Sequence, residues 1–343
     1  MALFRQKTTP NGPSPLHSID LVLADLDGVV YKGPAALPHA VESLNAAAES
    51  VRVAYITNNA SRTDATVATH LSDLGLNVAP SDVVTSPQAA VTLLAELVPA
   101  GSTVLVVGGD GLVVEVERAG FTVTRSADDA PAAVIQGFAP EVGWTQLAEA
   151  AFALAAPEGE TGIPWVATNT DWTIPVARGL APGNGTLVSA VHTAVGRLPV
   201  FAGKPEVAIF DEAFQRFGSR NALMIGDRLD TDILGAQRAG IRSVHVMTGV
   251  DRAKQLLAAD KTMRPDFILG DLRELHEPYP ESVVNAKENS VRVGDAEVRM
   301  RSNVVEIVRH GDDKLNLLRA GCHVIWGSGL AIYGLEVPAE LYS

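Results

Sequence analysis

Short apolar runs alternate with longer amphipathic segments along the chain, and this alternation constrains the fold more than any other feature. Leu21–Ala24 and Val51–Ile56 are the first two runs, and residues 38–48 between them place apolar side chains at helical spacing. Each run ends in polar or acidic residues, as expected of a buried strand that leaves a sheet. Strands that alternate with helices form parallel sheets with right-handed crossovers. The pattern therefore predicts an α/β protein with a Rossmann-like parallel sheet.

The same alternation also divides the chain into regions. A second complete series of strands and helices lies between residues 82 and 184, and the first pattern resumes after it. We therefore predict a core domain from residues 19–81 and 185–278, with residues 82–184 inserted as an α/β cap domain. Residues 279–343 differ in character, with a charged hairpin, a further strand and one helix, and they predict a small α+β C-terminal appendage.

Composition argues against several classes of partner and site. The 343 residues contain 27 Lys and Arg but 40 Asp and Glu, and the formal net charge of −13 would repel nucleic acid and anionic membranes. The single cysteine can form neither an internal disulfide nor a thiolate metal cluster. Residues 1–18 lack the apolar segment of a signal peptide and are expected to form a flexible tail. No apolar run has the length of a membrane span, so we expect a cytoplasmic protein.

Two carboxylates follow the first apolar run, in the order Asp25-Leu26-Asp27-Gly28. Ligands bind at the carboxyl ends of strands in parallel α/β sheets, and side chains two residues apart in an extended segment point to the same side. Two such carboxylates repel each other unless a proton or a cation lies between them. A solvated turn with Gly28 at its tight position would produce the same pattern, so these residues alone leave both interpretations open.

Polar groups suited to an anion follow at two other places. Thr57, Asn58 and Asn59 come after the second strand, where a hydroxyl, amides and main-chain N–H groups suit phosphate oxygens. Lys204 precedes a helix that begins near Pro205, and an ammonium group beside a helix N-terminus also favours an anion. Taken alone, each feature is better explained by an ordinary helix cap or a surface lysine.

A second acidic group, Asp227 and Asp232, follows the apolar run Ala222–Ile225. Oxygen ligands at a strand end suit a hard ion such as Mg²⁺, which takes few carboxylates and completes its shell with water and phosphate. A capped helix would explain this group by itself. However, all four groups fall at a strand end or a helix start on one predicted sheet edge. Together they predict a functional site there.

The order and wording of these groups resemble the haloacid dehalogenase superfamily. The four matching stretches are Asp-Leu-Asp-Gly-Val-Val-Tyr, Ile-Thr-Asn-Asn-Ala-Ser, Gly-Lys-Pro and Ile-Gly-Asp-Arg-Leu-Asp-Thr-Asp-Ile. They look like the p-nitrophenylphosphatase-like subfamily, which carries a large α/β cap between its second and third motifs. The resemblance spans about residues 19–275 and implies a Mg²⁺-dependent phosphatase that forms a phosphoaspartate intermediate.

The resemblance also implies a role for each motif residue. Asp25 would be the nucleophile, and Asp27 would be the general acid and base. The Mg²⁺ ligands would be the Asp25 carboxylate, the main-chain carbonyl of Asp27, and Asp227, with Asp232 behind them as an orienting group. The groups that hold the phosphoryl oxygens would be Thr57, Asn58, Asn59 and Lys204.

A finer resemblance concerns the substrate. Residues 167–172 and 182–185 look most like actinobacterial members of this subfamily. The extended C-terminus resembles that of actinobacterial glycerol-phosphate phosphatases, whose appendage is an incomplete acetyltransferase-like fold. This implies hydrolysis of glycerol 3-phosphate to glycerol and phosphate, with phosphoglycolate, pyridoxal phosphate or a sugar phosphate as alternatives. Asp171 and Trp172 are candidates for contacts to the alcohol. A phospho-accepting signalling receiver also combines Asp, Thr, Lys and Mg²⁺, but Asp27 and the inserted cap argue against it.

Overall fold

The computed structural model describes residues 11–156, 162–176 and 178–343 and divides into two compact units. Unit 1 comprises Met1–Val53 and Asn221–Ser343, and unit 2 comprises Ala54–Arg220. The first ten residues of the predicted N-terminal tail lie outside the described part of the chain. Within that part, no helix combines the length and the apolar character needed to cross a membrane.

Unit 1 contains a parallel sheet in which β15, β14, β13 and β1 lie in that order. All residues of β1 and β13 are buried. A strand that is covered on both faces needs apolar side chains on both, which explains the continuous apolar runs of these two segments. The result confirms the predicted parallel α/β core. The bounds are β1 (Leu21–Ala24), β13 (Ala222–Gly226), β14 (Arg242–Val246), β15 (Phe267–Leu269), α1 (Ala40–Ala48), α8 (Leu234–Ala239) and α9 (Ala253–Ala258), with the short strands β2 (Tyr31–Lys32) and β3 (Ala35–Ala36).

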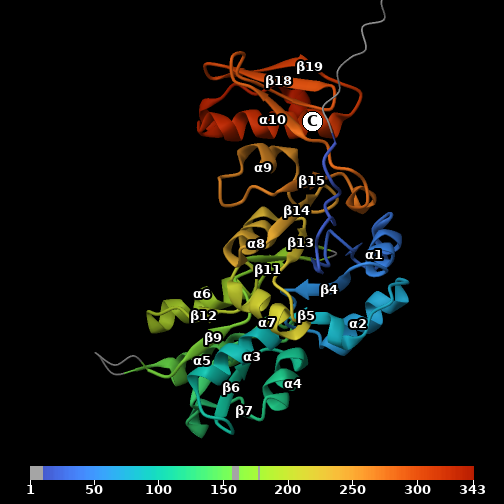
Figure 1. Cartoon of the computed structure of the whole chain (residues 1–343). Helices are drawn as coiled ribbons and strands as arrows, with labels where there is room; N and C mark the ends of the chain where they lie inside the picture. The colour runs from blue at the N-terminus through green and yellow to red at the C-terminus, as the bar shows by residue number, and fades with distance from the viewer. Residues whose placement is uncertain (1–10, 157–161, 177) are drawn as a thin grey trace, which may run out of the picture. The chain divides into compact units, whose positions relative to one another are not determined.

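The C-terminal segment of unit 1 folds as an antiparallel sheet with one long helix (Figure 1). Its elements are β16 (Ser282–Asn285), β17 (Ser290–Val293), β18 (Ala296–Arg301), β19 (Val304–Arg309) and α10 (Lys314–Ser328). In α10, Leu318, Cys322 and Ile325 are buried, in agreement with their helical spacing. They belong to one apolar cluster with Leu256 and Ile268 of the parallel-sheet region. The predicted appendage therefore shares its core with the rest of unit 1 and does not stand apart from it.

Unit 2 contains a second parallel sheet, with β12, β9, β8, β6 and β7 in that order. Helix α6 contributes Val188 and Val191 to the apolar cluster that also holds Trp165 of β9. Helix α6 begins at Asn184 and β12 follows it, so the boundary predicted at residue 184 falls inside the layer. The bounds are β6 (Thr103–Val107), β7 (Thr122–Thr124), β8 (Ala133–Gln136), β9 (Trp165–Ala167), β12 (Val200–Phe201), α4 (Asp110–Arg118), α5 (Trp144–Leu154) and α6 (Asn184–Val195).

The remaining elements of unit 2 lie before and after this layer in the sequence, except for a hairpin between β9 and α6. They are β4 (Arg52–Thr57), which begins in unit 1, β5 (Val83–Thr85), α2 (Asp64–Asp73), α3 (Ser86–Leu97), α7 (Val207–Phe217) and the hairpin of β10 (Thr173–Val176) and β11 (Gly179–Pro182). Strands β4 and β5 pair in parallel. The hairpin was not predicted, because Pro175, Gly179 and Pro182 are residues more typical of loops than of strand interiors.

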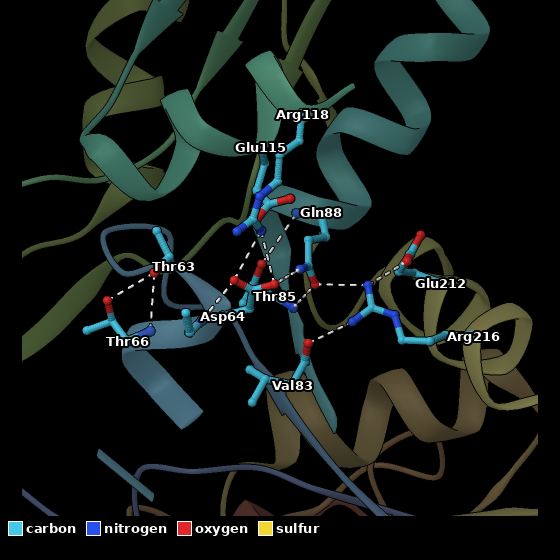
Figure 2. Close-up of polar contacts among 11 residues, drawn as sticks. Thr63, Asp64, Thr66, Val83, Thr85, Gln88, Glu115, Arg118, Glu212 and Arg216 are labelled. Carbon is cyan, nitrogen blue, oxygen red and sulfur yellow. Dashed lines mark hydrogen bonds and ion pairs between the residues drawn. The ribbon is translucent and has the colours of Figure 1, made fainter. Parts of the chain in front are cut away.

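A polar network joins the helices around the start of α3 (Figure 2). The Gln88 side chain donates to Asp64 Oδ2 (3.2 Å) and accepts from Thr85 N (3.1 Å) and from Arg216 Nη2 (3.0 Å). Arg118 of α4 pairs with the Asp64 carboxylate at 3.1 Å and with Glu115 at 2.7 Å. The network thus connects α2, α3, α4 and α7 where the chain enters the inserted layer.

Candidate active site

The first acidic residue of the predicted site is fixed by the sheet of unit 1. The main-chain N–H of Asp25 donates to Ile225 O (2.8 Å), which extends the pairing of β1 with β13 by one residue. The Asp25 side chain is half-buried at this carboxyl end of β1, and Asp27 is exposed. The turn that follows Asp27 is closed by Gly28 N donating to Tyr31 O (2.9 Å), with Gly28 at φ +84°. The two carboxylates therefore occupy different environments, as expected if they have different roles.

Asp227 is held at the end of β13 by main-chain donors. Its side chain is 1% exposed, and Val250 N donates to its Oδ2 (2.6 Å). Asp251 N donates to the Asp227 carbonyl (3.1 Å). A Cβ atom at Gly28 or Gly249 would overlap Asp227 Oδ2. Two glycines and a tight loop thus form a cradle that sets the position of this carboxylate.

Asp232 lies in a π-helical turn, Leu229–Ile233, that precedes α8. Its Oδ2 accepts from Asp227 N and Arg228 N, each at 3.1 Å, and its side chain is 1% exposed. A Cβ atom at Gly226 would overlap the Asp232 side chain. Asp232 therefore holds the main chain of the loop that carries Asp227.

Within the described residues, Asp25, Asp227 and Asp232 each place one carboxylate oxygen within 4.8 Å of the others. Such an all-oxygen donor set, partly buried and fixed by main-chain contacts, fits a hard divalent cation such as Mg²⁺ or Ca²⁺. The sequence placed Asp232 behind the ligands, whereas the structure brings its carboxylate into the same cluster. The part assigned to Asp27 involves its main-chain carbonyl, and its carboxylate is not a member of this cluster.

His245 supports the same loop from β14. The side chain is fully buried, its Nε2 lies 3.1 Å from Asp251 O, and desolvation lowers the pKa of its imidazole to about 4. The Asp251 carboxylate accepts from Leu229 N (2.7 Å), and burial raises the pKa of this carboxyl group. The sequence reasoning missed this loop. The Thr248-Gly249 pair after β14 was the available signal, since it stands at the end of another parallel strand.

The predicted anion-binding residues lie in unit 2. Thr57 is buried, and its Oγ1 accepts from Asn59 N (3.1 Å), so the hydroxyl keeps its own proton for donation. Lys204 is 2% exposed, with its Nζ 3.4 Å from Ile56 O. The Asn59 amide oxygen accepts from Ser61 N and Ser61 Oγ in a local turn. These contacts hold the lysine and the hydroxyl in a buried setting rather than on an open surface.

The Asn58 side chain is used differently from the prediction. Its Nδ2 donates to Lys204 O (3.0 Å) and to Asp171 Oδ1 (3.2 Å), and its Oδ1 accepts from Lys204 N (2.8 Å). Both amide protons are therefore engaged within the protein. The predicted phosphate contact of Asn58 can come from its main chain but not from these amide donors.

Comparison with known proteins identifies the family. Residues 22–122 match the haloacid dehalogenase-like hydrolase family, and residues 201–275 match a second, HAD-hydrolase-like family description. The chain is 42% identical over 309 residues to D-glycerol 3-phosphate phosphatase from Mycobacterium tuberculosis, covering 90% of this chain and 86% of that protein. The chain belongs to the haloacid dehalogenase-like hydrolases.

Other relatives in this hydrolase family agree with the assignment. Acid sugar phosphatase from Staphylococcus aureus is 32% identical, with 74% of this chain and 95% of that protein covered. The crystal structure of the M. tuberculosis glycerol phosphate phosphatase in complex with magnesium superposes with a TM-score of 0.83, at 39% identity and 95% coverage of both chains. The p-nitrophenyl phosphatase from Archaeoglobus fulgidus gives a TM-score of 0.69 at 26% identity, covering 76% of this chain and 98% of that one. These likenesses confirm the predicted family and fold class.

Proposed function

We propose that this hydrolase is a Mg²⁺-dependent phosphatase that cleaves a small phosphate monoester, with glycerol 3-phosphate as its substrate. The observation that carries the proposal is the cluster of Asp25 and Asp227, which follow the adjacent parallel strands β1 and β13, with Asp232 of the π-helical turn. Closely spaced carboxylates repel one another, and a cation bound between them relieves that repulsion. A bound Mg²⁺ would supply that charge and would neutralise the oxygens of an incoming phosphate.

In the proposed mechanism, the residues of β1 and the following turn carry out the chemistry. An Asp25 carboxylate oxygen attacks phosphorus, a new aspartyl–phosphate bond forms, and the bond to the ester oxygen breaks. Asp27 gives its proton to the departing alkoxide, which leaves as the alcohol. Asp27 then removes a proton from water, and the resulting hydroxide attacks phosphorus to release phosphate and restore Asp25. The exposed position of Asp27 allows this exchange of protons with water.

We also propose that residues of unit 2 bind the phosphoryl oxygens. Lys204 supplies a positive charge, Thr57 donates its hydroxyl proton, and Asn58 and Asn59 contribute from the same loop. The burial of Thr57 and Lys204 supports this proposal, because a buried positive charge attracts a phosphate more strongly than an exposed one does. Residues 82–184, extended to β12, would form the cap that limits access to small phosphate esters.

The substrate assignment rests on the relatives. The M. tuberculosis protein that covers most of this chain is named a D-glycerol 3-phosphate phosphatase. The S. aureus relatives, named acid sugar phosphatases, support sugar phosphates as the second candidate class. Phosphoglycolate and pyridoxal phosphate complete the set of substrates to be compared. Membership of a hydrolase family removes the support for a signalling receiver.

A phosphate-release assay over these four substrate classes, with Mg²⁺ and with EDTA, tests the proposal. We expect multiple turnovers in Mg²⁺, the highest kcat/KM with glycerol 3-phosphate, and no turnover in EDTA. Equal turnover in metal-free buffer would contradict the metal requirement. A higher kcat/KM for a sugar phosphate would contradict glycerol 3-phosphate as the substrate but would agree with the proposed phosphatase mechanism.

A further inference from the structure

The side chain of Asn58 and the main chain of Lys204 form a two-point pairing. Lys204 N donates to Asn58 Oδ1 (2.8 Å), and Asn58 Nδ2 donates to Lys204 O (3.0 Å). A primary amide that engages both the N–H and the C=O of one residue fixes the position and orientation of that peptide unit, much as a paired strand does. The pairing spans 146 residues of sequence and fixes the backbone from which the Lys204 ammonium extends.

A third loop joins this pairing. Asn58 Nδ2 also donates to Asp171 Oδ1 (3.2 Å), while the Asn58 carbonyl accepts from Ser86 Oγ (2.8 Å) and Asn169 Nδ2 (2.7 Å). The loop after β4, the loop after β9 and the loop before α7 therefore meet at one asparagine. We call this set of contacts the Asn58 junction.

Backbone packing independently supports the junction. Gly203 N donates to Thr168 O (2.7 Å), which connects the loop before Lys204 to the loop after β9. A Cβ atom at Gly203 would lie 2.5 Å from Thr168 O and 2.6 Å from Asn58 Oδ1, both shorter than real Cβ contacts allow. The absence of a side chain at residue 203 is thus a condition for the close approach of the three loops.

The contacts also establish which way the amide points. Lys204 N–H can only donate and Lys204 O can only accept, so the oxygen of the Asn58 amide must face the former and its nitrogen the latter. The Asp171 carboxylate, which accepts when ionised, requires the same orientation. The two amide protons are then both used, and the side chain has no proton left to offer a phosphate.

We propose that Asn58 is a positioning residue that holds Lys204 in its phosphate-binding pose, with Asp171 locking the amide in orientation. This inference rests on the proposed function, since it assigns Asn58 to the phosphate-binding lysine of that reaction. Asp171 belongs to the loop after β9, in the inserted layer. The junction therefore links a loop predicted to contact the alcohol group of the substrate with the lysine proposed to bind the phosphoryl group.

Two variants of the full-length protein, which first change Asn58 and then exchange the amide and carboxylate of Asn58 and Asp171, test the proposal. In Asn58→Asp, the side chain can still accept from Lys204 N, but Lys204 O loses its donor and the new carboxylate faces Asp171. We expect kcat/KM for p-nitrophenyl phosphate to fall about 100-fold, and the inhibition constant of inorganic phosphate to rise about tenfold. The Mg²⁺ concentration for half-maximal activity should change by less than about twofold, because the cation cluster of unit 1 is intact.

The double variant Asn58→Asp/Asp171→Asn restores a donor opposite the new carboxylate, and we expect it to recover about tenfold of the loss. Asp171→Asn alone should lower kcat/KM for p-nitrophenyl phosphate by much less than Asn58→Asp does, since its amide oxygen still accepts from Asn58. Asn303→Asp makes the same chemical change at an exposed turn and should leave all constants unchanged. If Asn58→Asp does not fold, Asp171→Leu, which removes the acceptor of Asn58 Nδ2, should still raise the phosphate inhibition constant about fivefold.

The outcomes separate the two proposals. An inactive wild type would overturn the proposed function and the role of Asn58 with it. An active wild type would preserve the function, and the role of Asn58 alone would be overturned in either of two cases. One is that Asn58→Asp keeps the wild-type phosphate inhibition constant. The other is that Asp171→Asn gives no recovery in a folded double variant.

Discussion

The acidic cluster of unit 1 and the Asn58 junction of unit 2 are built in opposite ways. The carboxylates of Asp227 and Asp232 accept from main-chain N–H groups of Val250, Asp227 and Arg228. The Lys204 peptide is held instead by a side-chain amide that lies 146 residues away in the sequence. One region is thus shaped by backbone, and the other by a single replaceable side chain.

The difference teaches where each region is vulnerable. Main-chain donors cannot be deleted by changing side chains, so the acidic cluster should be disturbed chiefly by losing a ligand or by adding a Cβ where glycine permits close contact. The Asn58 junction should lose its contacts to Lys204 when the Asn58 amide is replaced by another group, even if the backbone is unchanged.

The largest effect should come from removing the cation. In EDTA, turnover should fall by about 10³-fold or more, because a bound metal contributes several kcal/mol of charge stabilisation. Added Mg²⁺ should restore the rate, and Ca²⁺ should restore it less, because it favours more ligands and looser geometry. Steady-state assays after dialysis will measure this. Full activity without a divalent ion would show that the reaction does not depend on a cation bound by the acidic cluster.

The next effect tests the glycine cradle. Gly249→Ala places a Cβ atom where Asp227 Oδ2 lies, so the carboxylate must shift. We expect the Mg²⁺ activation constant to rise about 10- to 100-fold, since disturbed support of a ligand typically costs this much in affinity. Gly327→Ala is the matched control, as its added Cβ atom would meet no atom within 4 Å. Equal Mg²⁺ activation constants in the two variants would contradict a role of the glycine cradle in positioning Asp227.

A smaller effect should follow from the C-terminal segment. Leu318 is 5% exposed and shares an apolar cluster with Leu229 and Ile233, which flank Asp232. Leu318→Ala should lower the free energy of unfolding by about 2 to 5 kcal/mol. We also expect a several-fold rise in the Mg²⁺ activation constant. Leu330→Ala, at a half-exposed side chain, is the control in denaturant titrations. An unchanged stability would mean that the segment does not share the core.

The smallest effect concerns pH. His245 has a native pKa of about 4, below the ordinary value of 6.5, so the native state keeps it neutral while the unfolded chain takes up a proton. Its contribution to stability is complete above pH 6.5 and is lost as the pH falls toward 4. Between pH 7 and pH 5, this loss should amount to about 2 kcal/mol. Urea titrations should show a flatter dependence in His245→Gln than in the control His310→Gln. Parallel curves would contradict the shift.

The acidic cluster could be predicted from the sequence, whereas the Asn58 junction could not. Asp25 and Asp227 follow apolar strands directly, and strands that pair in parallel bring their ends to the same edge. The partners of Asn58 lie 113 and 146 residues away, and no local pattern encodes their meeting. The hairpin of β10 and β11 was not predicted, because Pro175 and Gly179 are residues typical of loops. The packing of α10 was missed because an amphipathic face predicts burial without naming its partner.

We propose that Asp25 becomes phosphorylated during turnover, and trapping the phosphorylated enzyme tests this most directly. Asp27→Asn keeps the main-chain carbonyl but loses the acid and base, which typically contributes about 10²- to 10⁴-fold in rate. With p-nitrophenyl phosphate, whose leaving group needs little protonation, attack should proceed while hydrolysis of the intermediate stalls. Mass spectrometry of the acid-quenched variant should find phosphate on Asp25. Phosphate on any other residue, or normal turnover by Asp25→Asn, would contradict the account.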